Sequence, residues 1–232
     1  KGRKVEGEVI EILERAKSGF LGIGSCPAKI RVSYGEEEEI PEQSRIVTST
    51  YSMTTDDWKN MNVFAATVQA CHHLGLLQFF AIYLYLEGMC SYKDFYNGFI
   101  SYFSARPESV AGRALDKING FLDLVLEEKG TLSCSDERFG DVLWTFEEYL
   151  FLYLTYESEK FYAEAEEFLL GFGIEKDIFN NLMLFQRSLA RRPFDGKTEF
   201  DVSYNFLDYF REAIDCRKIP LVREDTTVTV DA

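Results

Sequence analysis

The sequence predicts a mainly α fold: a multi-helix bundle with a small β-hairpin or short sheet contributed by the N-terminal part and the C-terminal region. Apolar residues recur at intervals of three and four through most of residues 54–189, which is the period of amphipathic helices. Short stretches in which apolar residues alternate fall before residue 51 and after residue 199. The 20 Phe and 13 Tyr residues supply a bulky core or an apolar contact surface. We place residues 1–50 in a small helix plus hairpin segment, alternatively the end of an upstream domain, and residues 51–232 in a helical domain.

Composition narrows the classes of partner and compartment. The 39 acidic and 25 basic side chains give a net charge of −14, which repels nucleic acid phosphates and anionic lipids, so neither is an expected partner. The five cysteines fit neither a disulfide framework nor a metal-ligand spacing, which favours a reducing compartment. The longest apolar run, Leu74–Leu86, is too short for a membrane span, and we expect no signal peptide, because no continuous apolar run follows the first basic residues. We therefore expect a soluble, cytoplasmic protein, and the missing initiator Met suggests a fragment or a processed chain.

The first fifty residues contain one predicted helix and two predicted strands. Apolar residues share one face of residues 5–17, and a glycine-rich run, GFLGIGS, follows. Because this run follows a helix, it predicts a flexible turn in preference to a phosphate-binding loop. Lys29–Tyr34 and Arg45–Tyr51 are the predicted strands of a hairpin. The acidic stretch GEEEEIPEQ between them is expected to be a solvated loop and no cation site.

Residues 54–88 predict one long helix that is apolar on almost all sides. Thr54 or Thr55 can cap its first turn, where Asp56 and Asp57 interact favourably with the helix dipole. The expected core residues of this helix are Trp58, Met61, Ala65, Val68, Leu76, Phe79, Phe80 and Tyr83. The helix is the predicted centre of the bundle.

Capping residues and apolar stripes predict the elements that follow. Ser91 with Asp94, and Thr145 with Glu148, have the spacing of helix N-caps. Gly130 is the predicted left-handed residue at the end of its helix. The predicted helices cover residues 91–106, 109–128, 145–170 and 174–189, with a last short helix opened by Asn205 and Asp208. Residues 200–204 predict a strand, and residues 221–230 predict a strand or a frayed tail.

Histidines and acidic residues are the candidates for a metal site. His72 and His73 are the only histidines, and neighbours on a helix point about 100° apart, so they cannot hold one ion from one face. The glutamates of residues 157–167 lack the Glu-x-x-His motif of a carboxylate-bridged metal pair, so they predict a solvated face. Glu157 is the exception, because it lies beside an apolar stripe. A structural role for the histidine pair is favoured, with one histidine on a cofactor-facing surface as the alternative.

The order of several segments carries a resemblance. The run RIVTSTYSMTTDDWKNMNVFAATVQACHHLGLLQFFAIYLY is followed by CSYKDFYNGFISYF, EKFYAEAEEFL and FDVSYNFLDYF. From Arg45 to Ile214, this order resembles the C-terminal region of cobalamin-binding radical SAM enzymes. The resemblance implies a parent enzyme that uses S-adenosylmethionine, a [4Fe-4S] cluster and cobalamin. Such enzymes hold the cluster in a C-x-x-x-C-x-x-C loop, and no cysteines here have that spacing.

The resemblance therefore implies an accessory helical C-terminal domain of a cobalamin-dependent radical SAM enzyme. We expect it to have no cluster, cobalamin, metal or catalytic site of its own, and to pack against upstream catalytic domains of the same polypeptide. The residues expected to face the substrate or the neighbouring domain are His72, His73, Tyr92, Asp94, Tyr96, Tyr204 and Asn205, with Ser91 and Phe206 in the same motifs. Two alternatives stay open: an independent helical domain that binds a protein or a small molecule, and a stand-alone metalloenzyme that uses His72 or His73.

Overall fold

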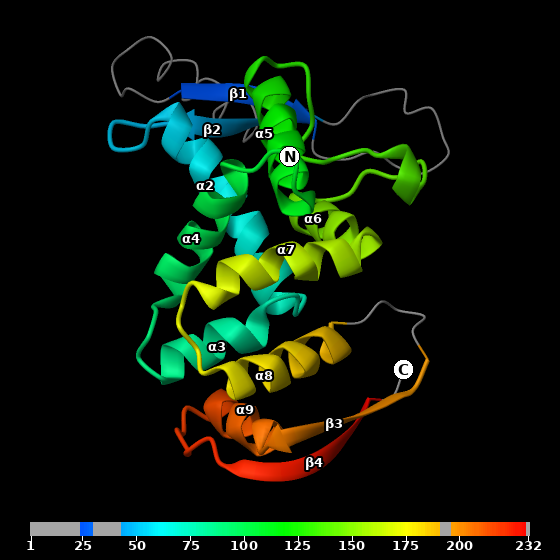
Figure 1. The fold of residues 1–232 in the computed structure, drawn as a ribbon. Helices are drawn as coiled ribbons and strands as arrows, with labels where there is room; N and C mark the ends of the chain where they lie inside the picture. Colours follow the sequence, from blue (N-terminus) through cyan, green and yellow to red (C-terminus); the bar gives the residue numbers. More distant parts are fainter. Residues whose placement is uncertain (1–23, 30–42, 191–195, 231–232) are drawn as a thin grey trace, which may run out of the picture. The chain divides into compact units, whose positions relative to one another are not determined.

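The computed structural model describes residues 24–29, 43–190 and 196–230, and it confirms a mainly α fold (Figure 1). Its main elements are β1 Gly24–Lys29, β2 Gln43–Ser49, α2 Thr55–Val68, a π turn Gln69–His73, α3 Gln78–Leu86, α4 Tyr92–Ser104, α5 Val110–Leu126, α6 Phe146–Tyr156, α7 Ser158–Leu170, α8 Lys176–Leu189, β3 Thr198–Tyr204, α9 Phe206–Ile214 and β4 Arg223–Val230. The two pairs of strands are antiparallel, β1 with β2 and β3 with β4. The predicted helix at residues 5–17 and the acidic loop lie outside the described residues.

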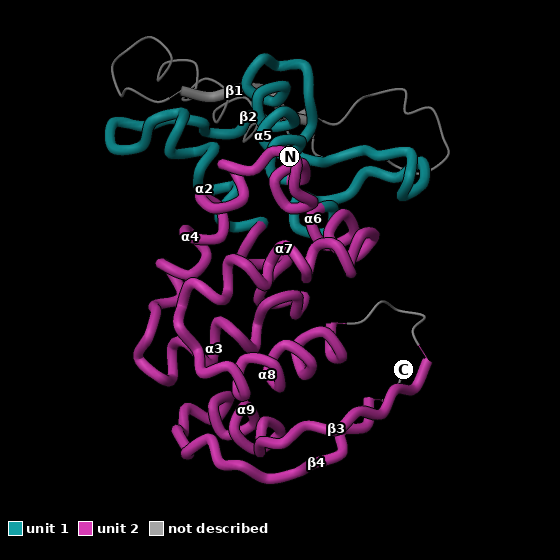
Figure 2. The backbone as a smooth tube through the Cα atoms, in the orientation of Figure 1, with its two compact units in different colours: residues 1–66, 115–149 teal, residues 67–114, 150–232 magenta. Residues whose placement is uncertain are grey.

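The chain divides into two compact units, which Figure 2 shows in different colours. Unit 1 comprises residues 1–66 and 115–149, and unit 2 comprises residues 67–114 and 150–232. Each boundary falls within a helix, so α2, α5 and α6 each contribute to both units. The sequence suggests a domain boundary after residue 50. This boundary is not one of those between the two units, and it stays a prediction.

The first strand of the N-terminal pair in unit 1 covers other residues than predicted. β2 overlaps the predicted strand Arg45–Tyr51, but the strand that pairs with it is Gly24–Lys29, whereas residues 30–34 lie outside the described residues. Gly24 and Ser25, which were expected in a turn, are therefore in a strand. The backbone hydrogen bonds to β2 outweigh the weak intrinsic preference of these two residues for a turn.

The start of α2 confirms the predicted cap and corrects part of the predicted core. The Thr54 hydroxyl accepts from the Asp57 amide at 3.1 Å, and the Asp57 carboxylate accepts from the Thr54 amide at 2.8 Å. Trp58 is buried as expected, whereas Met61 and Ala65 are exposed. The buried stripe passes instead through Val63, Ala66, Thr67 and Ala70, on the other side of the helix.

The prediction of one long helix over residues 54–88 is wrong. α2 runs into the π turn Gln69–His73, and α3 begins only at Gln78, after a bend of 90°. Gly75 lies in the break with φ at +85°, a conformation that ends a right-handed helix and that only glycine adopts without strain. No single described helix is long and apolar enough to cross a membrane, although the bent pair Thr55–His73 and Gln78–Leu86 has the required length and composition when taken together.

The helices of residues 91–170 are confirmed in position, with two corrections. The predicted helix 145–170 is two helices, α6 and α7, which are separated at Glu157. Its capping box is present, because Thr145 and Glu148 exchange hydrogen bonds of 3.2 and 3.4 Å. The residue with left-handed backbone after α5 is Glu128, with φ at 62°, and not Gly130 as predicted. A Cβ atom at Gly130 would lie 2.9 Å from the backbone nitrogen of Val125, so close packing explains this glycine.

The core of unit 2 is largely aromatic. α3 packs against α4, α8 and α9, and α8 packs against β3. Phe79 lies 4.9 Å from Phe185 and 4.8 Å from Phe210 between ring centroids. Phe168 of α7 contacts Phe95 and Phe99 of α4 in the same way. The predicted bulky core is therefore confirmed within this unit.

The C-terminal residues form a strand pair rather than a tail. β4 pairs with β3 along its length, so the strand alternative for residues 221–230 is correct. Asn205 precedes α9 as predicted, but its side chain does not cap that helix. Its Oδ1 atom accepts from the Val222 amide at 2.9 Å instead, which ties the start of α9 to the residue before β4.

Removing the cap of α4 is expected to destabilise the chain by about 1 kcal/mol. The Ser91 hydroxyl accepts from the Asp94 amide at 3.1 Å and donates to the Asp94 carboxylate at 2.7 Å, and Ser91→Ala removes both bonds. Ser101→Ala, on the exposed side of the same helix, is the matched control and should change stability little. Urea unfolding of the two variants measures the difference, and equal losses would contradict the assigned cap.

Candidate functional site

The π turn of unit 2 directs His72 towards α4. The Nδ1 atom of His72 lies 2.8 Å from the hydroxyl oxygen of Tyr96. The His72 ring also makes edge contacts with Tyr92 at 5.5 Å and Tyr96 at 6.0 Å between centroids. The structure thus brings three of the predicted residues together, and His73, which is exposed, adjoins them through the His72 ring. Single π turns are frequent at functional sites, because they re-aim a side chain that a regular helix would place elsewhere.

Burial keeps the His72 and Tyr96 side chains uncharged near neutral pH. Burial, and then the charge of His73, lower the pKa of His72, and burial raises the pKa of Tyr96. A neutral phenol can donate its proton to the unprotonated Nδ1 atom of a neutral imidazole. The pair is therefore suited to positioning and neutral hydrogen bonding. Among the described residues, no group of three or more His, Cys, Asp or Glu side chains is placed to hold a metal ion.

We expect the free energy of unfolding to fall as the pH is lowered through about 6.5, the ordinary pKa of histidine. His72 takes up a proton at that pH in the unfolded chain, whereas its pKa is lower in the folded chain, so acid favours the unfolded state. His72→Phe should weaken this dependence in urea unfolding between about pH 7.5 and pH 5. His73→Gln keeps His72 buried and should retain most of it. A His72→Phe variant with the wild-type pH dependence would show that His72 is not its source.

Asp94 and the Tyr204–Asn205 pair have roles of their own. Asp94 belongs to the cap of α4 through Ser91. The Tyr204 hydroxyl donates to Asp177 of α8 at 2.8 Å, and Asn205 bonds the residue before β4. Within the described ranges, no hydrogen bond or ring contact joins Tyr204 or Asn205 to His72. Four of the seven predicted residues therefore cluster around His72, Asp94 belongs to the cap of α4, and Tyr204 and Asn205 form a separate group at the β3–α9 junction.

Side chains that the sequence did not single out complete the break between α2 and α3. The Gln186 amide nitrogen donates to the Gly75 carbonyl at 2.6 Å, and its oxygen accepts from the Phe79 amide at 2.9 Å. The Tyr162 hydroxyl donates to the Leu76 carbonyl at 2.9 Å. Gln186 is fully buried, so these bonds satisfy backbone groups that the break would otherwise leave unpaired. We refer to Gln186 and Tyr162 as the break clamp.

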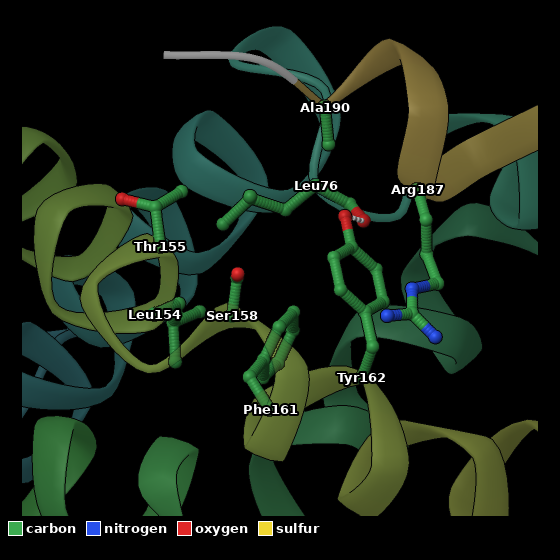
Figure 3. Close-up of a pocket in the computed structure, with 8 residues that line it drawn as sticks. All are labelled: Leu76, Leu154, Thr155, Ser158, Phe161, Tyr162, Arg187 and Ala190. Carbon is green, nitrogen blue, oxygen red and sulfur yellow. Dashed lines mark hydrogen bonds between the residues drawn. The ribbon is translucent and has the colours of Figure 1, made fainter. Parts of the chain in front are cut away.

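A cavity of about 160 Å³ lies beside the break clamp (Figure 3). α6 contributes Leu154, α7 contributes Ser158, Phe161 and Tyr162, and α8 contributes Arg187, while Leu76 comes from the break. A wider hollow of about 480 Å³ shares Ser158, Tyr162 and Arg187 and extends along α8. Among the described residues, the cavity lining therefore combines apolar side chains with hydroxyl groups and the guanidinium of Arg187.

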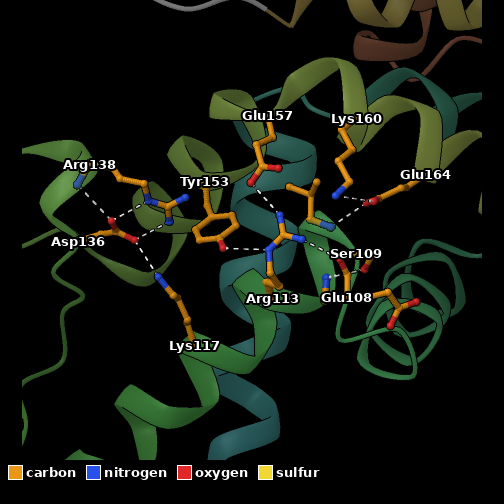
Figure 4. Close-up of polar contacts among 12 residues, drawn as sticks. Glu108, Ser109, Arg113, Lys117, Asp136, Arg138, Tyr153, Glu157, Lys160 and Glu164 are labelled. Atoms are coloured by element: carbon orange, nitrogen blue, oxygen red, sulfur yellow. Dashed lines mark hydrogen bonds and ion pairs between the residues drawn. The ribbon is translucent and has the colours of Figure 1, made fainter.

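Two networks of charged side chains stabilise the helices (Figure 4). In unit 2, Arg113 donates to Glu157 at 2.7 Å and to the Tyr153 hydroxyl at 3.3 Å, which confirms that Glu157 differs from a solvated glutamate. Glu164 differs as well, and here the prediction of a solvated face is wrong, because it accepts from the Val110 amide at 2.7 Å and caps α5.

The second network lies within unit 1 and centres on Asp136. Its carboxylate accepts from Arg138 at 2.6 and 2.8 Å, from Lys117 at 3.0 Å and from the Tyr149 hydroxyl at 3.1 Å. Arg138, followed by Lys117 and Tyr149, lowers the pKa of Asp136 despite its burial. A carboxylate that is this fully paired is a structural anchor rather than a general base.

The described thiols do not fit an iron–sulfur cluster. A [4Fe-4S] cluster needs several thiolates around one point. Cys71, Cys90, Cys134 and Cys216 are free, and burial raises the pKa of Cys71 and Cys134, which opposes thiolate formation. No convergent group of these residues is present in the ranges that the structure describes.

Comparison with known proteins indicates a distant relationship to cobalamin-dependent radical SAM methyltransferases. The chain is 23% identical over 188 residues to the cobalamin-dependent radical SAM methyltransferase TokK of Streptomyces tokunonensis. The aligned region covers 74% of this chain and 28% of that protein. It is also 23% identical over 193 residues to the 2-(S-pantetheinyl)-carbapenam-3-carboxylate methyltransferase of Streptantibioticus cattleyicolor, covering 76% and 28%. The family model described as Jag N-terminus matches residues 4–34. The chain thus spans 28% of the length of these curated relatives.

Proposed function

We propose that this chain is the accessory helical C-terminal domain of a cobalamin-dependent radical SAM enzyme. The observation that carries the proposal is the pattern of coverage: about three quarters of the chain align, but with only 28% of each relative. The cysteine spacing agrees with this role, because cluster binding would have to come from residues elsewhere. In this proposal S-adenosylmethionine, the cluster and cobalamin are bound by upstream catalytic domains of the same polypeptide. The free cysteines are in keeping with a cytoplasmic location.

We propose that the upstream domains pack on the surface beside His72. Tyr85 is 53% exposed and stacks on Tyr92 with ring centroids 4.6 Å apart. Leu74 and Met89 are each 42% exposed nearby in sequence. Exposed aromatic and Met side chains are enriched at protein interfaces. The match of residues 4–34 to a separate family model supports treating residues 1–50 as a module distinct from the helical domain.

The first test is cofactor content. The complete product of the gene that encodes this chain is purified and reconstituted without oxygen, and its absorption is compared with that of the 232-residue chain. We expect cobalamin and iron–sulfur absorption in the complete product and neither in the isolated chain. A complete product that takes up neither cofactor would refute the proposal.

The second test is the packing surface. In the complete product, Tyr85→Arg should lower enzymatic turnover and leave cofactor absorption intact, because it places a charge in the proposed contact. Tyr51→Arg is the matched control, since Tyr51 is 97% exposed and lies in unit 1. Equal activities of the two variants would exclude the proposed surface.

A specific observation favours a second candidate function, that of an independent small-molecule-binding domain. It is the cavity of about 160 Å³, whose described lining residues all belong to unit 2. The two functions differ in their requirement for upstream residues. An isolated chain that binds a small molecule, from a gene with no cofactor-binding region, would favour this alternative.

A further inference from the structure

We propose that the cavity beside the break clamp binds a small monocarboxylate with an apolar body of about the size of a benzene ring. This site does not depend on the proposed accessory role, and it deepens the alternative small-molecule-binding function by naming the class of ligand. The fully buried side chains of Leu76, Leu154 and Phe161 line the cavity. Its volume of about 160 Å³ is close to the ~150 Å³ of cavities that accept benzene, and Thr155, Ser158, Tyr162 and Arg187 add polar groups to its lining. The lining and the volume therefore suit one small molecule that carries both an apolar part and a polar group.

Arg187 supplies the positive charge. Its guanidinium lies 5.5 Å from the centre of the Tyr162 ring and lines both the cavity and the wider hollow. One Nη2 hydrogen points to Glu159, whereas Nε and Nη1 make no hydrogen bond to any residue that the structure describes. Arginine has five N–H donors and stays protonated, so several remain to bind an anion.

Two neighbours of Arg187 select the kind of anion. Glu159, at the rim of the wider hollow, carries a negative charge that opposes a dianion such as phosphate more strongly than a monoanion. Ser158 offers a hydroxyl on the cavity side of α7, in the space between Leu76 and Leu154 (Figure 3). This hydroxyl has no hydrogen-bond partner within the described ranges, so it can donate to a carboxylate oxygen. The geometry points to a carboxylate at Arg187 and Ser158, with its apolar body against the three buried walls.

The test compares three probes of similar size that differ in charge: benzoate, benzyl alcohol and benzylamine. Titration of the wild-type chain, followed by calorimetry and by amide NMR, should show saturable benzoate binding at one site. Benzyl alcohol should bind about tenfold more weakly, since it lacks the charge-assisted bond. Benzylamine should bind more weakly still. Benzylamine affinity equal to that of benzoate, or no saturable benzoate binding, would overturn the proposal.

Variants assign the charge to Arg187. Arg187→Gln should reduce benzoate affinity about tenfold and leave benzyl alcohol affinity unchanged. Arg187→Lys keeps the charge and should lose less. The matched control is Arg211→Gln, because Arg211 is an exposed arginine that pairs with Asp208 on α9 and is absent from the cavity. Unchanged benzoate affinity in folded Arg187→Gln would overturn the site. The probe comparison in the wild-type chain decides the question by itself if that variant does not fold.

Discussion

Gly112→Ala is expected to destabilise unit 2 by about 3 kcal/mol, among the largest effects of any single methyl group added to this chain. A Cβ atom at this position would overlap the carbonyl oxygen of Arg106 and would lie 2.7 Å from the carbonyl oxygen of Phe103. Both neighbours are backbone atoms, so no side-chain rotation can relieve the overlap. The Arg106 carbonyl is also held in place, because it accepts from the Ser109 amide at 3.0 Å and from the Ser109 hydroxyl at 2.6 Å.

The start of α5 explains why this carbonyl comes so close. The Ser109 hydroxyl accepts from the Gly112 amide at 3.0 Å, so one serine links the end of the α4–α5 connection to the first turn of α5. Adding the methyl group must break this arrangement or move the connection as a whole. Urea unfolding measures the loss, and amide exchange of residues 109–112 should accelerate in the variant.

Gly120→Ala in the same helix is the matched control. A Cβ atom at Gly120 would meet nothing within 4 Å, and the residue is exposed. Alanine is favoured over glycine in a helix by about 1 kcal/mol, so this variant should be as stable as the wild type or more stable. If Gly112→Ala were tolerated equally well, the close approach of the Arg106 carbonyl would be incorrect.

Local signals in the sequence predicted the caps of α2, α4 and α6 and the buried stripe of α5. The caps at Ser91 and Thr145 depend on residues three apart, and the structure has the corresponding hydrogen bonds. The stripe of α5 is also local, and Leu115, Ile118, Leu122 and Val125 are buried as its period requires. Such features are predictable because each depends on one helical turn.

The helix breaks were not predictable from periodicity. Leu74, Leu76 and Leu77 flank Gly75, so the hydrophobic pattern runs through the break although the backbone bends there. Likewise Leu154 and Phe161 keep helical spacing across the break at Glu157. In both places the sequence contains a local residue that can mark a helix break: a glycine in one case and a glutamate beside an apolar stripe in the other.

The two candidate sites also differ in how far the sequence predicts them. His72, Tyr92 and Tyr96 belong to the seven residues expected to face the substrate or the neighbouring domain, and the structure places these three side by side. The cavity was not predicted, because Leu76 meets Tyr162 and Arg187 only through contacts between distant parts of the chain. No spacing rule connects residues that are separated by more than eighty positions.

Gln186→Leu is the second large expected effect, a loss of about 3–4 kcal/mol. Gln186 lies on α8 and reaches across to the break between α2 and α3, where it bonds the Gly75 carbonyl and the Phe79 amide. Leucine has a similar size but neither donor nor acceptor, so it leaves two backbone groups unpaired. A buried group without its partner costs about 1–3 kcal/mol, and here two such costs add. The amide of Phe79 should also exchange faster with solvent, because its acceptor is lost.

Gln69→Leu provides the matched control for this substitution. Gln69 is exposed and belongs to the π turn, so the same chemical change should alter the free energy of unfolding by no more than about 0.5 kcal/mol. Tyr162→Phe removes the third bond of the break clamp, to the Leu76 carbonyl, and should cost about 1–2 kcal/mol. This order of losses, Gln186 first, Tyr162 second and Gln69 last, follows from the number of backbone groups that each side chain satisfies. Equal losses for Gln186→Leu and Gln69→Leu, or unchanged exchange at Phe79, would mean that packing alone maintains the bend.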